Sequence, residues 1–336
     1  VDSPKEIVTL GEGGTPLLHL RRLGKQCDLP SLYLKDESQN PTGTFKARGL
    51  SAAVSMALKM GVQKVAIPTA GNAGGALAAY GAKAGLKVFV FMPKTSPVAN
   101  IVEARMTGAQ VELTQGTIAD SARRLKEREA TEGWFDISTL REPYRLEGKK
   151  TMGYELAEQL KWILPDVLLY PTGGGTGLIG IWKAFEEMEE LGWIGKKRPR
   201  MVAVQSEGCA PIVKAFEEGW KSAKKWTTPT TFASGVCVPQ ALGDFLILAI
   251  LRESNGKALA VSDKAIYEAV REVGKQEGLL LAPEGAACWA ALKNLRKQGW
   301  IGSDEIVVIL NTGTGLKYID ALQDFEKKVA RSKIRN

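Results

Sequence analysis

Short apolar runs alternate along the chain with longer stretches in which apolar residues recur at helical spacing. The runs typical of strands lie at 65–68, 87–91, 110–113, 167–170, 201–205 and 306–310. The stretches typical of helices lie at 73–84, 120–130, 151–163, 178–191, 263–276 and 285–297. Because strands that alternate with helices of this length form βαβ units, the pattern predicts an α/β fold with open, parallel-rich sheets. The strand-like runs are apolar throughout, which indicates that helices cover both faces.

Length and composition fit a globular protein with a large core. A chain of 336 residues predicts roughly two domains, whose core needs no disulfide or metal for stability. Glycine is the unusual component, with 36 residues, and raises the question of where the backbone approaches another group closely. The single histidine, His19, excludes a metal site built from several histidines. A Ser-His-Asp triad or a Cys-His pair would also have to use His19.

The formal net charge of +8 comes from two basic runs. No aromatic residues alternate with these charges, as the stacking of nucleic-acid bases requires, so we predict a solvated surface and a frayed terminus. We therefore expect no nucleic-acid partner. The runs carry nine positive charges, which leaves the rest of the chain close to neutral: Lys196, Lys197, Arg198, Arg200, and, in the tail, Lys327, Lys328, Arg331, Lys333 and Arg335.

The four cysteines lie far apart and form no Cys-x-x-Cys motif, which is typical of reduced, mostly buried thiols in a cytoplasmic protein. No apolar run approaches the roughly 18–20 residues of a membrane-spanning helix, and the sequence does not begin with a signal peptide, so no membrane partner is expected. Val1 is not a methionine, so the printed sequence need not begin at the first residue of the protein.

The first of three glycine-containing turns, at 40–49, follows a strand-like run at 31–35 and leads into a predicted helix at 50–60. Thr42 or Thr44 is a candidate cap of this helix. Lys46 then lies in the first helical turn, where the positive end of the helix dipole disfavours an ammonium group. That position suits a lysine that must act as a neutral amine. An ordinary solvated lysine is an equally good interpretation of the residues alone.

The second turn, at 69–75, lies between the predicted strand at 65–68 and the predicted helix at 73–84. A strand, a turn of small residues and a helix N-terminus together form an arrangement that receives anions. Asn72 at this turn can present its amide to a ligand. It can equally be a simple N-cap of the helix.

The third turn contains five glycines within eight residues and lies between the strand-like run at 167–170 and the predicted helix at 178–191. Bare backbone N–H groups at a helix N-terminus favour the binding of a phosphate. The turn lacks the Gly-Lys-Ser/Thr ending of a nucleotide P-loop. It does contain Gly-x-Gly-x-x-Gly, followed later by Glu207, so an NAD-dependent dehydrogenase is an open alternative.

Taken together, these turns resemble the fold-type II pyridoxal-phosphate enzymes, whose fold is tryptophan synthase beta-like. Two further motifs carry the resemblance, Gly14-Thr15-Pro16-Leu17 and residues 311–317. The resemblance implies that Lys46 binds pyridoxal 5'-phosphate, that Asn72 contacts its phenolic oxygen and that Thr312 faces its pyridine nitrogen. It also implies a cradle for the cofactor phosphate, formed by Gly173, Gly174, Gly175, Thr176 and Gly177.

The chemistry of these residue types agrees with the resemblance. An aldehyde cofactor needs a lysine amine held unprotonated, as is expected at Lys46. A hydroxyl group at the ring nitrogen, from Thr312, leaves that nitrogen largely neutral and weakens the electron sink, which suits elimination and replacement better than transamination. Thr312 as a plain turn residue is the alternative.

Within this family, residues 143–151 resemble the threonine synthase segment whose arginine, here Arg145, binds a substrate phosphate. The resemblance implies conversion of O-phospho-L-homoserine and water to L-threonine and phosphate, with Lys46 as the base. Thr69, Asn72 and the backbone amide of Ala73 are the candidates for the substrate carboxylate. A surface ion pair of Arg145 with Glu142 or Glu147 is the alternative interpretation.

Two departures from the threonine synthase pattern leave the reaction open. Ala47-Arg48-Gly49 replaces Asp-Arg-Gly after the lysine, and Thr69-Ala70-Gly71 replaces a Ser-Ser or Ser-Gly pair before the asparagine. A serine/threonine dehydratase, which is an ammonia-lyase, is therefore the alternative. A member without catalytic activity would not need an intact Lys46 and Asn72.

The resemblance also implies a domain layout. A smaller α/β domain would comprise residues 45–140, and residues 1–44 together with 141–336 would form a larger cofactor-binding α/β domain. The cofactor would lie in a cleft at the carboxyl ends of the strands. A homodimer is expected by analogy.

Overall fold

The computed structural model describes residues 1–334 and divides them into two compact units. Unit 1 comprises Val1–Thr15, Gln39–Trp162 and Thr176–Gly195, and unit 2 comprises the rest of the described chain. These units are not identical with the domains expected from the sequence, because unit 1 also takes in residues 1–15 and two helices beyond residue 140. The domain bounds of 45–140 and the remainder stay a prediction.

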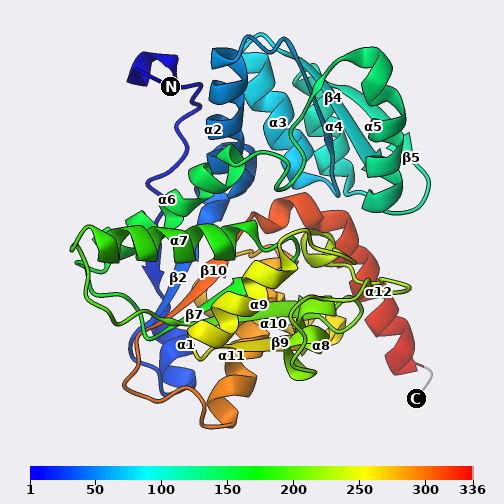
Figure 1. The fold of residues 1–336 in the computed structure, drawn as a ribbon. Helices are drawn as coiled ribbons and strands as arrows, with labels where there is room; N and C mark the ends of the chain where they lie inside the picture. The colour runs from blue at the N-terminus through cyan, green and yellow to red at the C-terminus, as the bar shows by residue number, and fades with distance from the viewer. Residues whose placement is uncertain (335–336) are drawn as a thin grey trace. The chain divides into compact units, whose positions relative to one another are not determined.

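Unit 1 contains a four-stranded parallel sheet in the order β5-β4-β3-β6. Figure 1 labels β4 and β5 of this sheet near the helices α3, α4 and α5. Its side chains alternate between two apolar layers. On one face, Val65 and Ile67 pack with the helices α2, α3 and α4, and on the other face, Ala66 and Phe89 pack with Leu125 of α5. The sheet is covered on both faces as the pattern predicts. Its elements are β3 (Lys64–Pro68), β4 (Lys87–Pro93), β5 (Gln110–Thr114), β6 (Phe135–Asp136), α2 (Lys46–Lys59), α3 (Asn72–Lys83), α4 (Val98–Met106) and α5 (Ile118–Glu132).

Two further helices of unit 1, α6 (Tyr144–Gln159) and α7 (Thr176–Glu190), pack against each other, and α6 packs on α2. The expected helix at 151–163 is wrong at both ends. Two polar side chains near the helix start, Arg145 and Lys149, are buried, so the apolar periodicity there did not reveal the helix. The helix ends before Lys161 and Trp162, whose φ angles are +56° and +64°.

Unit 2 contains a six-stranded sheet in the order β1-β2-β10-β7-β8-β9. Its pairings are parallel except for β1 with β2, so the sheet is parallel-rich as expected. β1 and β9 were not predicted. The strands are β1 (Leu17–His19), β2 (Leu32–Asp36), β7 (Val167–Pro171), β8 (Arg200–Ser206), β9 (Lys257–Val261) and β10 (Val307–Asn311).

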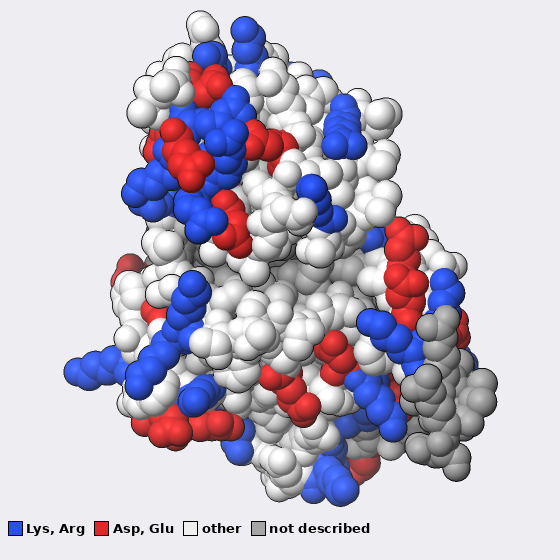
Figure 2. All heavy atoms as spheres, turned by 90° about the vertical axis from the view of Figure 1, so that its right-hand side faces the viewer, with Lys and Arg blue, Asp and Glu red and all other residues white. Residues whose placement is uncertain are grey.

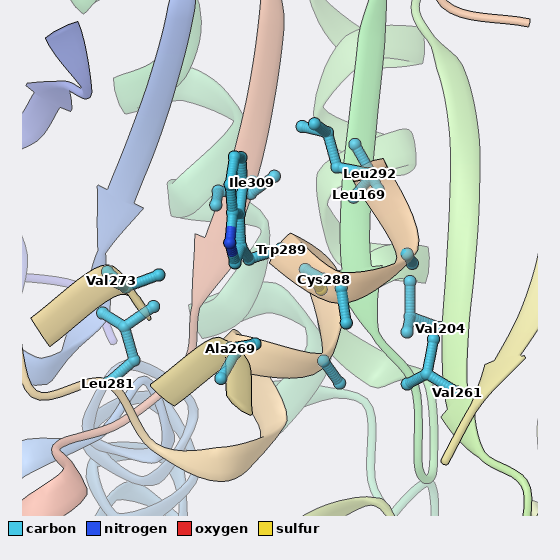
Figure 3. Close-up of a cluster of buried hydrophobic side chains, with 14 of the residues drawn as sticks. Leu169, Val204, Val261, Ala269, Val273, Leu281, Cys288, Trp289, Leu292 and Ile309 are labelled. Carbon is cyan, nitrogen blue, oxygen red and sulfur yellow. The ribbon is translucent and has the colours of Figure 1, made fainter. Parts of the chain in front are cut away.

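The core of unit 2 lies between this sheet and the helices α10 and α11. Figure 3 shows Trp289 and Leu292 of α11 beside Leu169 and Ile309 of the central strands. The buried thiol of Cys288 belongs to the same core, and none of the four cysteines, all of which the structure describes, forms a disulfide. The helices are α1 (Arg21–Gln26), α8 (Pro211–Glu217), α9 (Asp244–Glu253), α10 (Asp263–Glu277), α11 (Pro283–Lys297) and α12 (Ile319–Ile334).

Several charged side chains on the surface pair with opposite charges. Figure 2 shows basic and acidic side chains interspersed on one face. Lys197 pairs with Asp166, and Arg200 pairs with Glu305. Of the basic tail, Arg335 lies outside the described residues. Within residues 1–334, no helix is both long enough and apolar enough to cross a membrane.

Candidate functional site

The turn before α2 places Lys46 as the first residue of the helix, in the first helical turn as the sequence predicts, although the helix begins before the expected residue 50. Thr42 and Gly43 both have a φ of +62°, which makes the turn tight, and the Thr44 hydroxyl accepts a hydrogen bond from the Lys46 N–H at 3.3 Å. Lys46 is half-buried rather than solvated, and its Nζ lies 4.5 Å from the centroid of the Phe45 ring. This amine therefore lies on a side chain that begins a helix, is partly buried and is next to an aromatic ring.

Arg145 lies at the start of α6 and is fully buried, with 2% of its surface exposed. A surface ion pair with Glu142 or Glu147 is therefore wrong for this residue. Its Nη1 donates to the Ile137 carbonyl at 2.8 Å, and its backbone N–H donates to Glu142. Its Nε and Nη2 are buried without a hydrogen-bond partner among the described residues. These two groups form one edge of the guanidinium fork, which is the edge that grips a carboxylate or phosphate with two parallel bonds.

Lys149, one turn after Arg145, was not singled out from the sequence. Its side chain has no exposed surface, and its Nζ donates to the Thr176 hydroxyl at 2.6 Å. Burial lowers the pKa of Lys149 well below its usual value, and the charges of Arg145 and Lys46 lower this pKa further, whereas Glu142 opposes the shift. The four-residue spacing from Arg145 on a helix was the available signal, because such residues share one face.

Two glycines bring Lys46 close to this face of α6. A Cβ at Gly49 would lie 2.7 Å from the Arg145 carbonyl oxygen, and one at Gly148 would lie 2.1 Å from the Arg48 carbonyl oxygen. Only glycine permits α2 and α6 to cross this closely. Arg48 fixes the crossing through a two-pronged ion pair with Glu155, at 2.6 and 2.7 Å. Arg48 is thus a buried structural residue here.

The start of α3 holds the second set of predicted residues of unit 1. Gly71, with a φ of +144°, is the N-cap, and Asn72 is the first helical residue, so the interpretation of Asn72 as a simple N-cap is wrong. The Thr69 hydroxyl accepts a hydrogen bond from the Gly71 N–H at 3.0 Å. Thr69 is buried, and Ala73 is 7% exposed. The structure therefore gathers Thr69, Asn72 and Ala73 at one helix N-terminus.

In unit 2, the predicted residues lie at the carboxyl ends of neighbouring strands. β10 pairs in parallel with both β2 and β7. Thr312, which follows β10, and Gly173, which follows β7, therefore lie at the same end of the sheet, where the strands have their carboxyl ends. The Asn311 amide nitrogen donates to Asp36 at 2.7 Å and ties the ends of β10 and β2 together. Thr312 is 7% exposed. Ligands of open α/β sheets bind at the carboxyl ends of the strands.

The glycine-rich turn follows the carboxyl end of β7. Gly173, Gly174 and Gly175 follow β7 in unit 2, and Thr176 and Gly177 begin α7 in unit 1. A Cβ at Gly173 would lie 2.6 Å from the Gly235 carbonyl oxygen, and a Cβ at Gly175 would lie 2.1 Å from Ile247. Packing against the chain itself thus already requires glycine at these two positions. The turn still offers a helix N-terminus without bulky side chains, and this set of donors fits a phosphate ester.

The comparisons with known proteins decide between the phosphate-binding alternatives. The family model described as pyridoxal-phosphate dependent enzyme matches residues 8–313. The chain belongs to this family. Its cofactor is therefore pyridoxal phosphate, and the dehydrogenase alternative loses its support.

Curated relatives and solved structures agree with this assignment. The chain is 38% identical to a threonine synthase of Methanosarcina acetivorans over 93% of this chain and 77% of that protein. It is 35% identical to a threonine synthase of Methanocaldococcus jannaschii over 96% and 79%. A fungal L-serine ammonia-lyase from Rhizomucor miehei has a similar structure, with a TM-score of 0.79 at 22% identity, over 93% of this chain and 98% of that one. The predicted fold-type II class is confirmed.

Proposed function

We propose that the protein is a threonine synthase that converts O-phospho-L-homoserine and water to L-threonine and phosphate. The names of its relatives support this activity. The observation that carries the proposal is Arg145, whose buried Nε and Nη2 have no hydrogen-bond partner among the described residues. A substrate phosphate supplies the two acceptors that this fork requires. An unphosphorylated amino acid offers no such group beyond its carboxylate.

The predicted cofactor residues fit pyridoxal phosphate by their chemistry. When bound, this cofactor supplies an electron sink for a substrate carbanion. The N-terminus of α7 would hold its phosphate, through Gly173, Gly174, Gly175, Thr176 and Gly177. Asn72 would donate to the phenolic oxygen, and the Thr312 hydroxyl would face the ring nitrogen.

The chain's own residues carry out the proton transfers and bind the substrate. We propose that the Lys46 amine removes the proton at Cα and later moves protons at Cβ. Arg145 holds the phosphate that leaves from Cγ, and water then adds at Cβ. Thr69, Asn72 and the Ala73 N–H hold the substrate carboxylate at the N-terminus of α3, where the helix dipole favours an anion.

A two-substrate assay tests this function. We expect the holoenzyme to release equal amounts of phosphate and L-threonine from O-phospho-L-homoserine. Ammonia and 2-oxobutyrate formed from L-threonine alone, without phosphate release from the phosphorylated substrate, would establish the dehydratase instead. The similar structure named as an L-serine ammonia-lyase is the reason that the assay includes this alternative reaction.

Assembly and location are also proposals. We propose a homodimer in the cytoplasm, where four free cysteines such as Cys288 stay reduced. Light scattering on the purified holoenzyme would measure a mass of about twice 36.3 kDa for the dimer. A mass of about 36.3 kDa would contradict it.

A further inference from the structure

Two buried basic side chains lie one turn apart on α6, and a half-buried amine lies at the start of α2. These are Arg145, Lys149 and Lys46, and the charges of Arg145 and Lys46 both act on Lys149. Glu142 and Asp136 are the carboxylates that act on Arg145. Burial raises the pKa of Glu142, which weakens its contribution as an anion. Arg145 and Lys149 are therefore two buried basic side chains on one face of α6, and the carboxylate that acts on both, Glu142, is weakened as an anion by its own burial.

The burial of two basic side chains is costly for the folded protein. A buried charge without full compensation costs several kcal/mol, and an apolar side chain of similar size is often more stable at such a position. Lys149 donates a hydrogen bond to the Thr176 hydroxyl, which carries no charge to balance an ammonium group. A ligand with two negative charges would balance the cluster.

We propose that Arg145 and Lys149 together bind one phosphate monoester dianion, with Lys149 as the second cation of the site. This inference rests on the proposed function, because that function requires a phosphorylated substrate. The free edge of the Arg145 fork supplies two parallel donors, and the Lys149 ammonium supplies a compact charge.

The chemistry of the cluster favours a phosphate over a monoanion. A carboxylate or a halide satisfies the fork of Arg145 but leaves the charge of Lys149 unbalanced. A phosphate monoester carries nearly two negative charges at neutral pH and has three acceptor oxygens. The contact of Lys149 with Thr176 extends the donor set to the first residue of α7.

Two phosphate monoesters are available to this enzyme, the substrate and the cofactor. Thr176 belongs to the turn proposed for the cofactor phosphate, whereas Arg145 is proposed for the substrate phosphate. The two sources share one chemistry, and binding experiments with and without the cofactor in place separate them.

The test uses Lys149→Gln and Lys149→Met, with Lys150→Gln as the matched control. Lys150 follows directly on the same helix but pairs with Glu147 at 2.6 Å and with Glu187 at 3.0 Å. Binding of inorganic phosphate to the holoenzyme is measured by titration calorimetry. Binding of pyridoxal phosphate to the apoenzyme is followed by absorbance. Because a charge-assisted bond is lost, we expect either Lys149 variant to weaken one of these affinities about tenfold or more.

Each outcome has one meaning. Weaker phosphate binding by the holoenzyme assigns Lys149 to the substrate dianion. Weaker cofactor binding, with phosphate binding unchanged, assigns it to the cofactor dianion. If both affinities match those of the Lys150→Gln control, the proposal is wrong. Thermal melts without phosphate show whether the variants fold, and we expect Lys149→Met to unfold at the wild-type temperature or above it.

Different results would contradict the role of Lys149 and the proposed threonine synthase activity. If wild-type enzyme makes threonine and both Lys149 variants bind phosphate and cofactor normally, only the second cation is wrong. If the wild type makes no threonine but loses phosphate affinity through Lys149→Gln, the dianion site stands and the reaction must be another one. The calorimetric readout does not depend on turnover.

Discussion

The two faces of helix α6 carry similar charged residues in opposite circumstances. On the outer side, Lys150 pairs with Glu147 and Glu187, and the Tyr154 hydroxyl donates to Glu187 at 2.6 Å. On the inner side, Arg145 and Lys149 are buried, and the Nε and Nη2 of Arg145 have no hydrogen-bond partner among the described residues. The outer charges pair with one another, whereas the inner ones are those proposed to bind an anion from outside the chain.

The difference shows that the neighbours of a charged residue indicate its role better than its type does. Exposed ion pairs contribute at most about 1 kcal/mol each, so the outer network is replaceable. Buried cations with unused donors are costly to keep, so the inner face is best explained by a ligand. Four substitutions test this contrast.

The largest effect is expected for Lys46→Ala, which removes the amine that α2 places beside the inner face. Because this amine is the proposed base and cofactor ligand, we expect turnover to fall at least about a thousandfold. The purified variant should also lack the yellow colour of the holoenzyme. Lys59→Ala, at the other end of α2 and paired with Asp2, is the control and should keep both properties. A yellow, active Lys46→Ala enzyme would contradict the assignment.

A smaller effect is expected for Arg145→Lys, which keeps the charge but removes the fork. Loss of the two parallel bonds should lower kcat/KM for O-phospho-L-homoserine about a hundredfold. Steady-state kinetics on this variant and on Lys150→Gln measure the contrast between the two faces directly. Equal kcat/KM values for the two variants would contradict the proposal that the inner face of α6 binds the substrate and the outer face does not.

Gly148→Ala tests whether the close crossing of α2 and α6 holds the inner face together. The added methyl group would lie 2.1 Å from the Arg48 carbonyl oxygen, and overpacking of this kind costs about 2 kcal/mol in the free energy of unfolding. Gly195→Ala is the control, because a Cβ there meets nothing within 4 Å. Denaturant unfolding of both variants measures the difference, and equal midpoints would mean that the crossing adapts at no cost.

The smallest effect is the pH dependence of Lys149→Met. Folding lowers the pKa of Lys149 below its usual 10.5, so between the folded and unfolded pKa values the unfolded chain binds more protons. The folded wild type therefore gains stability relative to the variant as pH rises through this window. Arg145, Lys46 and Glu142 are the charged groups that act on Lys149. We expect the variant to be more stable by about 1 kcal/mol at pH 7, with the gap closing towards pH 10. Denaturant unfolding at several pH values measures it, and a constant gap would contradict the assigned titration.

The sequence predicts the fold of this protein further than it predicts the site. Apolar runs located most of the central strands, because two-sided burial leaves a clear signal in each. α6 was misplaced, because Arg145 and Lys149 are polar residues at buried positions. The motif at 40–49 indicated Lys46 as a candidate, but no local pattern shows that Gly49 and Gly148 lie where α2 and α6 cross. Contacts between residues a hundred positions apart depend on tertiary packing, which motifs do not encode.

The position of β10 has a consequence for how the chain is made. This strand lies between β2 and β7, yet its residues Val307–Asn311 leave the ribosome after almost every other part of unit 2. Until they emerge, β2 and β7 have no central partner, and each exposes an unpaired edge. Pairings this distant in sequence form slowly, and open edges promote aggregation. Chains that stop before residue 307 should therefore depend on chaperones, because unit 2 cannot complete its sheet during synthesis.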